Sequence, residues 1–243
     1  MKNNPKILYL FSGKRTDVYH GKIHHDYPDT PFYGMNHLGD FGFDAEYKDI
    51  YDILKSKKII QKLPFVWKHI LLTKFIKSYD IVFGSSILYN IFFKKIFRLK
   101  TKYVLLNISL NNTLFRNKKN KLKYKFIKYL IKQLDVIVCL SHFQIDDLVN
   151  NYQIDKHKLI FIPLGVDPDF WIPIDFSKNK YILSVGKDNG RDYKTLFEVA
   201  KKLPNEKFVV VCGKWNIEGL EVPNNVKVIY GLPIKELKKV YQS

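Results

Sequence analysis

A run of glycine and basic residues in the last quarter of the sequence has the composition of an anion-binding loop. Gly186 ends the apolar run YILSVG, and Lys187, Arg191 and Lys194 follow in close succession. A helix through TLFEVAKKL comes next, so its free backbone N–H groups and positive end would face the same loop. Cations placed in advance stabilise the negative charge that develops on a departing diphosphate. The alternative is an ordinary solvated loop in which Asp192 caps the helix.

Several other kinds of site are disfavoured by the residues. Cys139 and Cys212 lie inside apolar runs, VIVCLS and FVVVCG, which indicates buried strand residues rather than a disulfide or a zinc site. The chain has no GxGxxG motif and no P-loop, which argues against a dinucleotide oxidoreductase and a P-loop kinase.

The charge of the chain is strongly positive, with 41 Lys and Arg against 23 Asp and Glu. No acidic residue occurs between Asp80 and Asp135, where lysines, arginines and aromatic residues are dense. Such a surface attracts anionic lipid head groups, and its aromatic neighbours could enter the interface. Nucleic acid is attracted by the same field, but we expect no specific nucleic-acid partner. The lysine-rich composition of an AT-biased genome would explain the charge without a partner.

The elements that must position these residues follow the pattern of parallel strands joined by helices. The clearest helix is expected over residues 118–134, with Leu122, Phe126, Ile127, Leu130, Ile131 and Leu134 on one arc. The expected strands share short apolar runs: KILYLFS, DAEYKD, DIVFG, KYVLLN, DVIVCLS, KLIFIP, KYILSVG, KFVVVCG and NVKVIYG, starting at Lys6, Asp44, Asp80, Lys102, Asp135, Lys158, Lys180, Lys207 and Asn225. A last helix should open at Pro233.

A domain junction is expected after Pro163, because Gly165, Pro168 and Pro173 interrupt the alternation. We therefore divide the α/β chain into a first domain over 1–164, a linker over 165–179 and a partial second domain over 180–243. The second domain offers three strands, whereas a doubly wound nucleotide-binding domain usually needs five or six.

The order of motifs resembles glycosyltransferase family 4. DVIVCLSHFQIDDLVNNYQIDKHKLIFIPLGVDPDFW is similar to the family's last acceptor-domain strand, its serine turn at Ser141, a helix and the linker strand. SVGKDNGRDYKTLFEVA, followed by FVVVCG and NVKVIYGLPIKELKKVY, resembles the donor domain's first strands, phosphate loop and helices. The resemblance implies the GT-B fold, with two Rossmann-like domains of which the second is incomplete here.

The resemblance also implies which residues hold a nucleotide-sugar, the expected co-substrate. Gly186 matches a family glycine, Lys187 stands where relatives carry arginine, and Arg191 is the better candidate for a fork-shaped contact with diphosphate. Lys194 adds charge to the same loop. Gly213 resembles the family's glycine beside the nucleotide, with an ordinary strand-end turn as the alternative.

In the first domain the resemblance places the acceptor or the leaving phosphate beside two strand ends. Ser12 and Gly13 end the first strand, and Tyr33 and Gly34 precede or begin a helix that runs to Gly39 or Gly42. Turn-forming glycines and core aromatics are the alternative. Many relatives have a histidine after KYVLLN, where this chain has Asn107, Ile108 and Ser109, so no catalytic residue is assigned. Asn107, Ser109 and Ser141 are nevertheless expected in the cleft that binds the acceptor.

No metal or other cofactor is expected. Asp167-Pro168-Asp169 has the spacing that metal-dependent transferases of another fold use, but it falls in the expected linker. His24, His25 and Asp26 are read as a solvated polar loop.

These features predict a retaining, metal-independent hexosyltransferase-type enzyme of cell-envelope or polysaccharide synthesis, acting on a glycan or lipid-linked acceptor. The alternative is a non-catalytic module that binds nucleic acid or another polyanion. The opening MKNNPKILYLF lacks signal-peptide features, so we expect a cytoplasmic protein, peripheral on the inner face of the membrane. Because relatives carry two donor-binding glutamates beyond the last helix here, we expect little transferase activity from these 243 residues alone.

Overall fold

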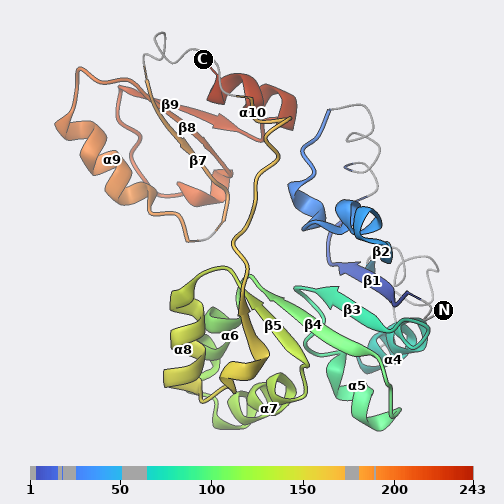
Figure 1. Ribbon diagram of the computed structural model, residues 1–243. Helices are drawn as coiled ribbons and strands as arrows, with labels where there is room; N and C mark the ends of the chain where they lie inside the picture. Colours follow the sequence, from blue (N-terminus) through green and yellow to red (C-terminus); the bar gives the residue numbers. More distant parts are fainter. Residues whose placement is uncertain are drawn as a thin grey trace. The chain divides into compact units, whose positions relative to one another are not determined.

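The computed structural model describes residues 4–15, 18, 26–50, 65–172, 181–188 and 190–242. The chain divides into two compact units (Figure 1). The first contains Met1–Lys22 and Asp29–Asp167, and the second contains Ile23–Pro28 and Pro168–Ser243. The division after Asp167 falls inside the expected linker, whose residues 173–179 lie outside the described part. The assignment of Asp26 to Pro28 to the second unit was not anticipated from the sequence.

The first unit contains a six-stranded sheet in the order β2-β1-β3-β4-β5-β6, with every neighbouring pair parallel. All six strands expected from the sequence are found. Parallel strands read as continuous apolar runs because helices cover both of their faces, and this explains why KILYLF and KYVLLN were recognisable. The strands are β1 (Lys6–Phe11), β2 (Asp44–Asp49), β3 (Ile81–Gly84), β4 (Lys102–Asn107), β5 (Val136–Cys139) and β6 (Leu159–Phe161).

The helices of this unit pack on a core that includes Leu8, Leu105, Ile137 and Leu148. Residues 30–41 form two short 3-10 helices rather than the expected helix from Tyr33, and the second ends at Gly42. The α-helices are α4 (Phe65–Ile76), α5 (Ile91–Ile96), α6 (Leu110–Asn117), α7 (Lys121–Lys132) and α8 (His142–Tyr152). The 3-10 helices are η1 (Thr30–Phe32), η2 (Met35–Phe41) and η3 (Lys156–Lys158).

Helix α7 differs from its expected form at its N-terminal end. It begins at Lys121 because the Asn120 side chain caps it, accepting a hydrogen bond from the Lys123 backbone N–H at 3.1 Å. Ile127, Leu130, Ile131 and Leu134 are buried as the apolar arc predicts. Leu122 and Phe126 belong to the same arc, yet they are 83% and 41% exposed. The apolar arc of α7 therefore includes residues that do not pack against the core of the first unit.

The second unit contains three parallel strands in the order β7-β8-β9. Tyr193, Phe197, Phe208, Val210 and Cys212 form its core. All three strands expected here are found, and Cys139 and Cys212 are both buried free thiols, as predicted. The elements are β7 (Ile182–Val185), α9 (Tyr193–Lys202), β8 (Phe208–Cys212), η5 (Lys214–Asn216), β9 (Val226–Tyr230) and α10 (Ile234–Tyr241).

In the described part of the chain, no helix is both long enough and apolar enough to cross a membrane.

Candidate functional site

A cavity of about 380 Å³ lies in the first unit, at the edge where its parallel strands end. Its apolar walls come from Tyr9, Phe83, Leu106, Val138, Leu140 and residues 162–166. Asp29, Thr30, Tyr33 and His37 supply the polar groups. Among the described residues that line it, none is a lysine or an arginine. The described lining can therefore exchange hydrogen bonds with a ligand that carries hydroxyl groups.

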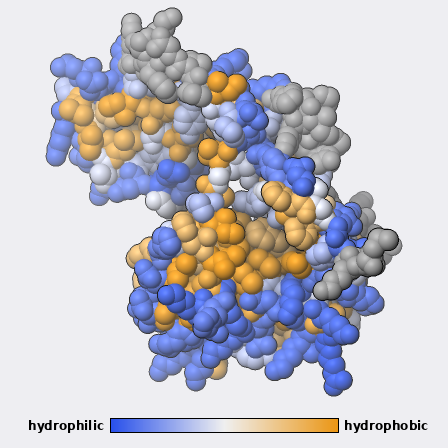
Figure 2. All heavy atoms as spheres, viewed as in Figure 1, coloured by the Kyte–Doolittle hydropathy of each residue, from blue (hydrophilic) through white to orange (hydrophobic). Residues whose placement is uncertain are grey.

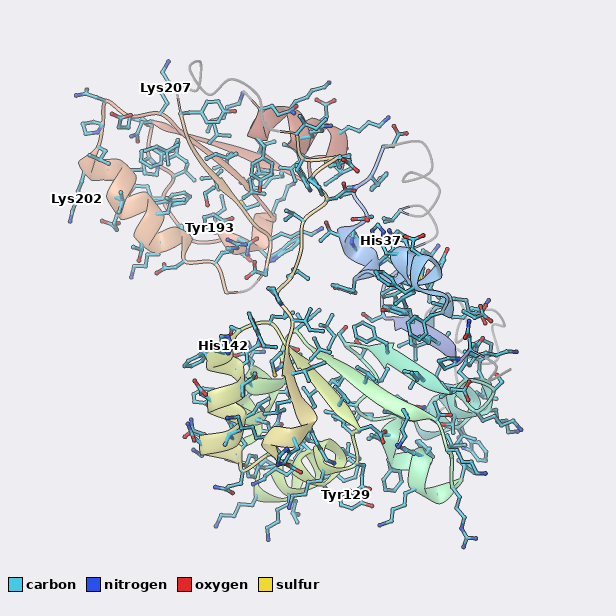
Figure 3. All side chains as sticks on the ribbon, viewed as in Figure 1. His37, Tyr129, His142, Tyr193, Lys202 and Lys207 are labelled. Atoms are coloured by element: carbon cyan, nitrogen blue, oxygen red, sulfur yellow. The ribbon has the colours of Figure 1, made fainter. Side chains whose placement is uncertain are left out.

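Asp29 and His37 form a hydrogen-bonded pair at this cavity. The Asp29 Oδ2 atom is 2.9 Å from His37 Nε2 and accepts a second bond from Asn36 Nδ2, also at 2.9 Å. The Asp29 backbone N–H donates to Asp167 Oδ2 at 2.9 Å. The Asp29 side chain is 19% exposed, whereas that of His37, labelled in Figure 3, is 58% exposed. The carboxylate is thus mostly buried and the imidazole is accessible.

Tyr33 and Gly34 are the two expected cleft residues that line this cavity. Both lie in the left-handed region, with φ of 52° and 80°, and they form the turn between η1 and η2. Glycine adopts such a φ readily, so Gly34 has a backbone role whatever it binds. Ser12 and Gly13 follow β1 but do not line the cavity.

Asn107, Ser109 and Ser141 have local structural roles outside the cavity lining. Asn107 is buried, and its side chain accepts from the Leu110 N–H at 2.9 Å and donates to Asn111 Oδ1 at 2.7 Å. Ser109 is the N-cap residue of α6. The Ser141 hydroxyl caps α8 by accepting from the Gln144 N–H at 3.2 Å. The side chains of Asn107 and Ser141 thus hold the starts of α6 and α8 at this sheet edge.

In the second unit, Gly186 and Arg191 pack tightly together in the loop after β7. A Cβ atom on Gly186 would lie 2.1 Å from Arg191 Nε, so only glycine leaves room for the arginine in this position. The Gly186 N–H donates to Val211 O at 2.9 Å, and its carbonyl accepts from the Tyr193 hydroxyl at 2.6 Å. The strand end, the arginine and the start of α9 are thus fixed to one another.

The charges in this loop are mixed. Arg191 Nε lies 2.7 Å from Asp188 Oδ2, and this pairing lowers the pKa of Asp188 and raises that of Arg191. Asp192 caps α9 by accepting from the Thr195 N–H at 3.0 Å, as the alternative reading of the loop predicted. Lys187 and Lys194 are exposed. A diphosphate would therefore compete with Asp188 for Arg191.

Gly213, at the end of β8, is joined to the same loop through Asn216. The Gly213 N–H donates to Asn216 Oδ1 at 3.0 Å, and Asn216 Nδ2 donates to the Asp188 carbonyl at 2.9 Å. The Trp215 ring packs against Gly213, where a Cβ atom would lie 2.5 Å away. Asn216 thus joins the end of β8, at Gly213, to the loop after β7, at Asp188, although these two loops are far apart in the sequence.

Sequence reasoning missed Asp29, His37 and Asn216. The available signal was that His37 belongs to the segment already assigned to the cleft. Among the described residues, no group of three or more His, Cys, Asp and Glu has the arrangement needed to hold a metal ion. Asp167 instead contacts Asp29, and His24 and His25 lie outside the described residues.

Comparisons with known proteins place this geometry in a family. Residues 38–170, more than half of the chain, match the model of Glycosyltransferase Family 4. No curated protein matches the chain in sequence. A glycosyltransferase from Rickettsia africae ESF-5 has a TM-score of 0.55 at 17% identity, covering 98% of this chain and 71% of that one.

Two further solved structures support the fold. Sucrose-phosphate synthase from Thermosynechococcus elongatus has a TM-score of 0.62 at 11% identity, with 98% of this chain and 73% of that one covered. HepE from Anabaena, solved in complex with UDP, has a TM-score of 0.50 at 12% identity, with 96% and 71% covered. The chain has the GT-B fold with an incomplete second domain, and it belongs to glycosyltransferase family 4.

Proposed function

We propose that this protein transfers a sugar from a nucleotide-sugar to a hydroxyl acceptor in cell-envelope or polysaccharide synthesis. The donor diphosphate binds Gly186, Lys187, Arg191, Lys194 and Gly213 in the second unit. The resemblance to the family supports hexosyl transfer with retention of configuration and without a metal ion. The structure of HepE with UDP supports a uridine nucleotide as the first donor to test.

The observation that carries this proposal is the packing of Arg191 against Gly186 at the start of α9. A guanidinium can bind two phosphate oxygens with its parallel N–H groups, and free backbone N–H groups at a helix start add further donors. Asp192 uses the Thr195 N–H, which leaves the other first-turn N–H groups of α9 for an anion. The arrangement is that of a phosphate site after a parallel strand.

Calorimetric titration with UDP, UMP and uridine tests this site. We expect affinity to fall in that order, because each phosphate removed takes away charge-assisted hydrogen bonds. Lys187→Ala should weaken UDP binding, whereas Lys207→Ala should not. Lys207 precedes β8 and so marks the opposite end of the strand from Gly213 (Figure 3). Equal affinity for UDP and uridine would contradict the proposal.

The acceptor is a glycan or a lipid-linked group that binds in the first unit's cavity. The segment that follows β6 supports the lipid-linked form, since Ile162, Leu164 and Val166 at the cavity are 50%, 55% and 75% exposed. Figure 2 shows apolar side chains gathered on this unit where its sheet ends. An apolar rim beside this cavity would accommodate the start of a lipid chain.

We further propose that an anionic membrane on the cytoplasmic side is a partner of the basic surface, defined here as the exposed residues of α5 and α7. Lys121, Lys125, Lys128 and Lys132 line a shallow groove of about 450 Å³ with two tyrosines. The exposed Leu122 and Phe126 lie on α7 among these lysines. Exposed apolar side chains on a lysine-rich helix match the interface of an anionic bilayer.

The nearby acid does not neutralise this surface. Asp135 accepts hydrogen bonds from Lys94 Nζ at 2.5 Å and from the Tyr103 N–H at 2.8 Å, and Lys102 Nζ lies 3.3 Å away. Burial alone would raise the pKa of Asp135, but these contacts together hold it below its ordinary value. The carboxylate is thus committed to internal partners, and the lysines of α7 remain available to lipid.

Sedimentation with vesicles tests the membrane partner. We expect binding to vesicles that contain phosphatidylglycerol, no binding to pure phosphatidylcholine, and loss of binding in high salt. Replacing Lys125 and Lys128 by Gln should weaken binding by about 1 kcal/mol for each lysine, whereas the same change at Lys201 and Lys202 of α9 should have little effect. Tighter binding to single-stranded oligonucleotide than to either vesicle would favour the polyanion-binding alternative.

A further inference from the structure

We propose that Trp215 is the residue on which the nucleobase of the donor stacks. This inference rests on the proposed transferase function, because the donor of that reaction is a nucleotide-sugar. The loop after β7 accounts for the diphosphate, and the base requires a further contact of different chemistry. Trp215 belongs to η5, the turn that follows β8 in the second unit's sheet.

Gly213 lies against one face of the Trp215 indole. A Cβ atom on Gly213 would lie 2.5, 2.6 and 2.7 Å from the indole atoms Cζ2, Cε2 and Cη2. A point beside the edge of the ring could not be almost equally close to these three consecutive atoms, so the contact is with the face of the six-membered ring. Glycine at position 213 therefore leaves room for the indole to lie flat over the backbone.

The opposite face of the indole is accessible. Trp215 is 59% exposed. Because Gly213 covers one face, this exposed area belongs to the other face and to the edges of the ring. Every nucleobase has a planar face that stacks on aromatic side chains. An indole that is supported on one side and open on the other provides the matching surface.

Hydrogen bonds hold the turn that carries Trp215 against the strand end and the loop after β7. The Gly213 N–H donates to Asn216 Oδ1 and the Asn216 N–H donates to the Gly213 carbonyl, both at 3.0 Å. Asn216 Nδ2 also donates to the Asp188 carbonyl at 2.9 Å, and Asp188 Oδ2 accepts from Arg191 Nε at 2.7 Å. The indole and the guanidinium are thus carried by two loops that are bonded to each other.

The order of the strands gives the base and the diphosphate neighbouring places. Strands β7 and β8 are paired in parallel, so their carboxyl ends lie side by side, about 4.8 Å apart. In doubly wound sheets a nucleotide binds at these ends. A ribose separates the base from the diphosphate, so a diphosphate at the end of β7 sends the base to the end of a neighbouring strand. Among the described strands, β8 is the one paired with β7.

Tyr230 is a second exposed aromatic residue at this edge. It ends β9 and is 45% exposed. Strand β9 pairs with β8 rather than with β7, so Tyr230 is one strand further from the diphosphate. The Lys214 Nζ atom lies 5.9 Å from the centroid of the Tyr230 ring, so a cation already lies beside this ring. Trp215 is therefore the closer aromatic surface by strand order and the more exposed of the two.

Calorimetric titration of the full chain with pyrophosphate and with UDP separates the two contacts. Trp215→Ala should weaken UDP binding by about 5- to 150-fold, the range for removing one stack between a base and an aromatic side chain. Pyrophosphate affinity should stay at the parent value, and Trp215→Phe should retain most of the UDP affinity. Trp67→Ala, which removes a similarly exposed tryptophan of α4 in the first unit, should change neither affinity.

Indole fluorescence provides a second measurement on the same proteins. A base stacked on Trp215 should quench its emission, so UDP should lower the fluorescence of the parent protein and pyrophosphate should not. The change caused by UDP should disappear in Trp215→Phe and remain in Trp67→Ala. An equal change in the parent and in Trp215→Phe would contradict stacking on Trp215.

The titrations distinguish a failure of this assignment from a failure of the donor site. If the parent binds both ligands, unchanged UDP affinity in Trp215→Ala would overturn the assignment and leave the donor site standing. Equal losses of UDP and pyrophosphate affinity in Trp215→Ala would also overturn it, because the indole would then support the loop instead of contacting the base. Loss of UDP affinity in Tyr230→Leu but not in Trp215→Ala would assign the stacking to Tyr230. A parent that binds neither ligand would refute the donor site and this assignment with it.

Discussion

The carboxyl ends of the two parallel sheets carry opposite chemistry. In the first unit the strand ends surround a cavity whose polar groups are a carboxylate, an imidazole and hydroxyls. In the second unit the strand ends carry Lys187, Arg191 and Lys194 beside the start of α9. Both are strand-to-helix edges of parallel sheets, the usual place for a ligand in such folds.

This difference illustrates that the fold determines where a ligand binds, whereas the side chains determine which ligand binds. A diphosphate needs cations and free N–H groups, which the second unit supplies. A hydroxyl needs hydrogen-bond donors and acceptors, which the carboxylate, the imidazole and the hydroxyls of the first unit's cavity supply. Substitutions in the first unit's cavity should therefore leave UDP binding by the second unit unchanged.

The largest expected effect is a loss of folding stability at alkaline pH, caused by Tyr9 in the first unit. Burial raises the pKa of Tyr9 to about 12, from 10.0 in the unfolded chain. Folding favours the protonated phenol, so this contribution is complete below about pH 10 and is lost as pH rises to about 12. At about 1.4 kcal/mol per pKa unit the loss is roughly 3 kcal/mol.

Tyr9→Phe cannot ionise, so urea unfolding between pH 10 and 12 should be less steeply pH-dependent in the variant than in the parent. Other tyrosines and lysines titrate in both proteins and cancel in the comparison. Parallel curves for the two proteins would show that the Tyr9 hydroxyl is solvated in the folded state.

The next effect is on the donor side. Arg191→Ala should weaken UDP binding by about 1.5 kcal/mol, the low end for a hydrogen bond to a charged group, because the side chain is 48% exposed and solvent screens it. This is about a tenfold increase in the Kd measured by calorimetry. His37→Gln should leave that Kd unchanged. Weaker UDP binding in His37→Gln would indicate that the cavity of the first unit also contributes to UDP binding.

A smaller effect is expected on the stability of the first unit, without a change in UDP affinity. Asn120→Ala removes the cap of α7 and should destabilise the first unit by about 1 kcal/mol. The denaturation midpoint should fall while UDP affinity in folded protein stays at the parent value. A change in UDP affinity would indicate that the donor site depends on the stability of the first unit.

The smallest effect should be a gain. Asp188→Asn removes the carboxylate that pairs with Arg191, so the guanidinium no longer has to leave a partner to bind phosphate. We expect UDP to bind a few-fold more tightly, since exposed ion pairs are weak. Asp155→Asn, which changes an exposed acid of the first unit, serves as the charge-matched control. Weaker binding in Asp188→Asn would mean that Asp188 positions Arg191 rather than competing for it.

The fold was largely readable from the sequence because parallel strands are apolar on both faces. Runs such as KYVLLN and FVVVCG, bounded by polar turns, fit little else in an α/β chain. Helix boundaries were less readable. The start of α7 depends on Asn120, and the exposure of Leu122 depends on how far neighbouring elements reach.

The loop after β7 was readable for a related reason. Gly186, Arg191 and the start of α9 are close in sequence, so strand, loop and helix determine their proximity. The link from Asn216 to Asp188 spans two loops, and periodicity carries no signal for it. The sequence also left open that Arg191 pairs with Asp188.

The sequence by itself determined the two parallel sheets, the order of strands along the chain, and the position of the cationic loop, because these depend on local apolar runs and on neighbours in the chain. Tertiary structure alone decided that Asp29 and His37 form a pair at the cavity of the first unit. Two consecutive 3-10 helices bring these side chains together, and the cavity walls come from strands distant in sequence. Hydrogen-bond geometry between side chains depends on backbone turns, such as the left-handed Tyr33 and Gly34, that composition and periodicity do not specify.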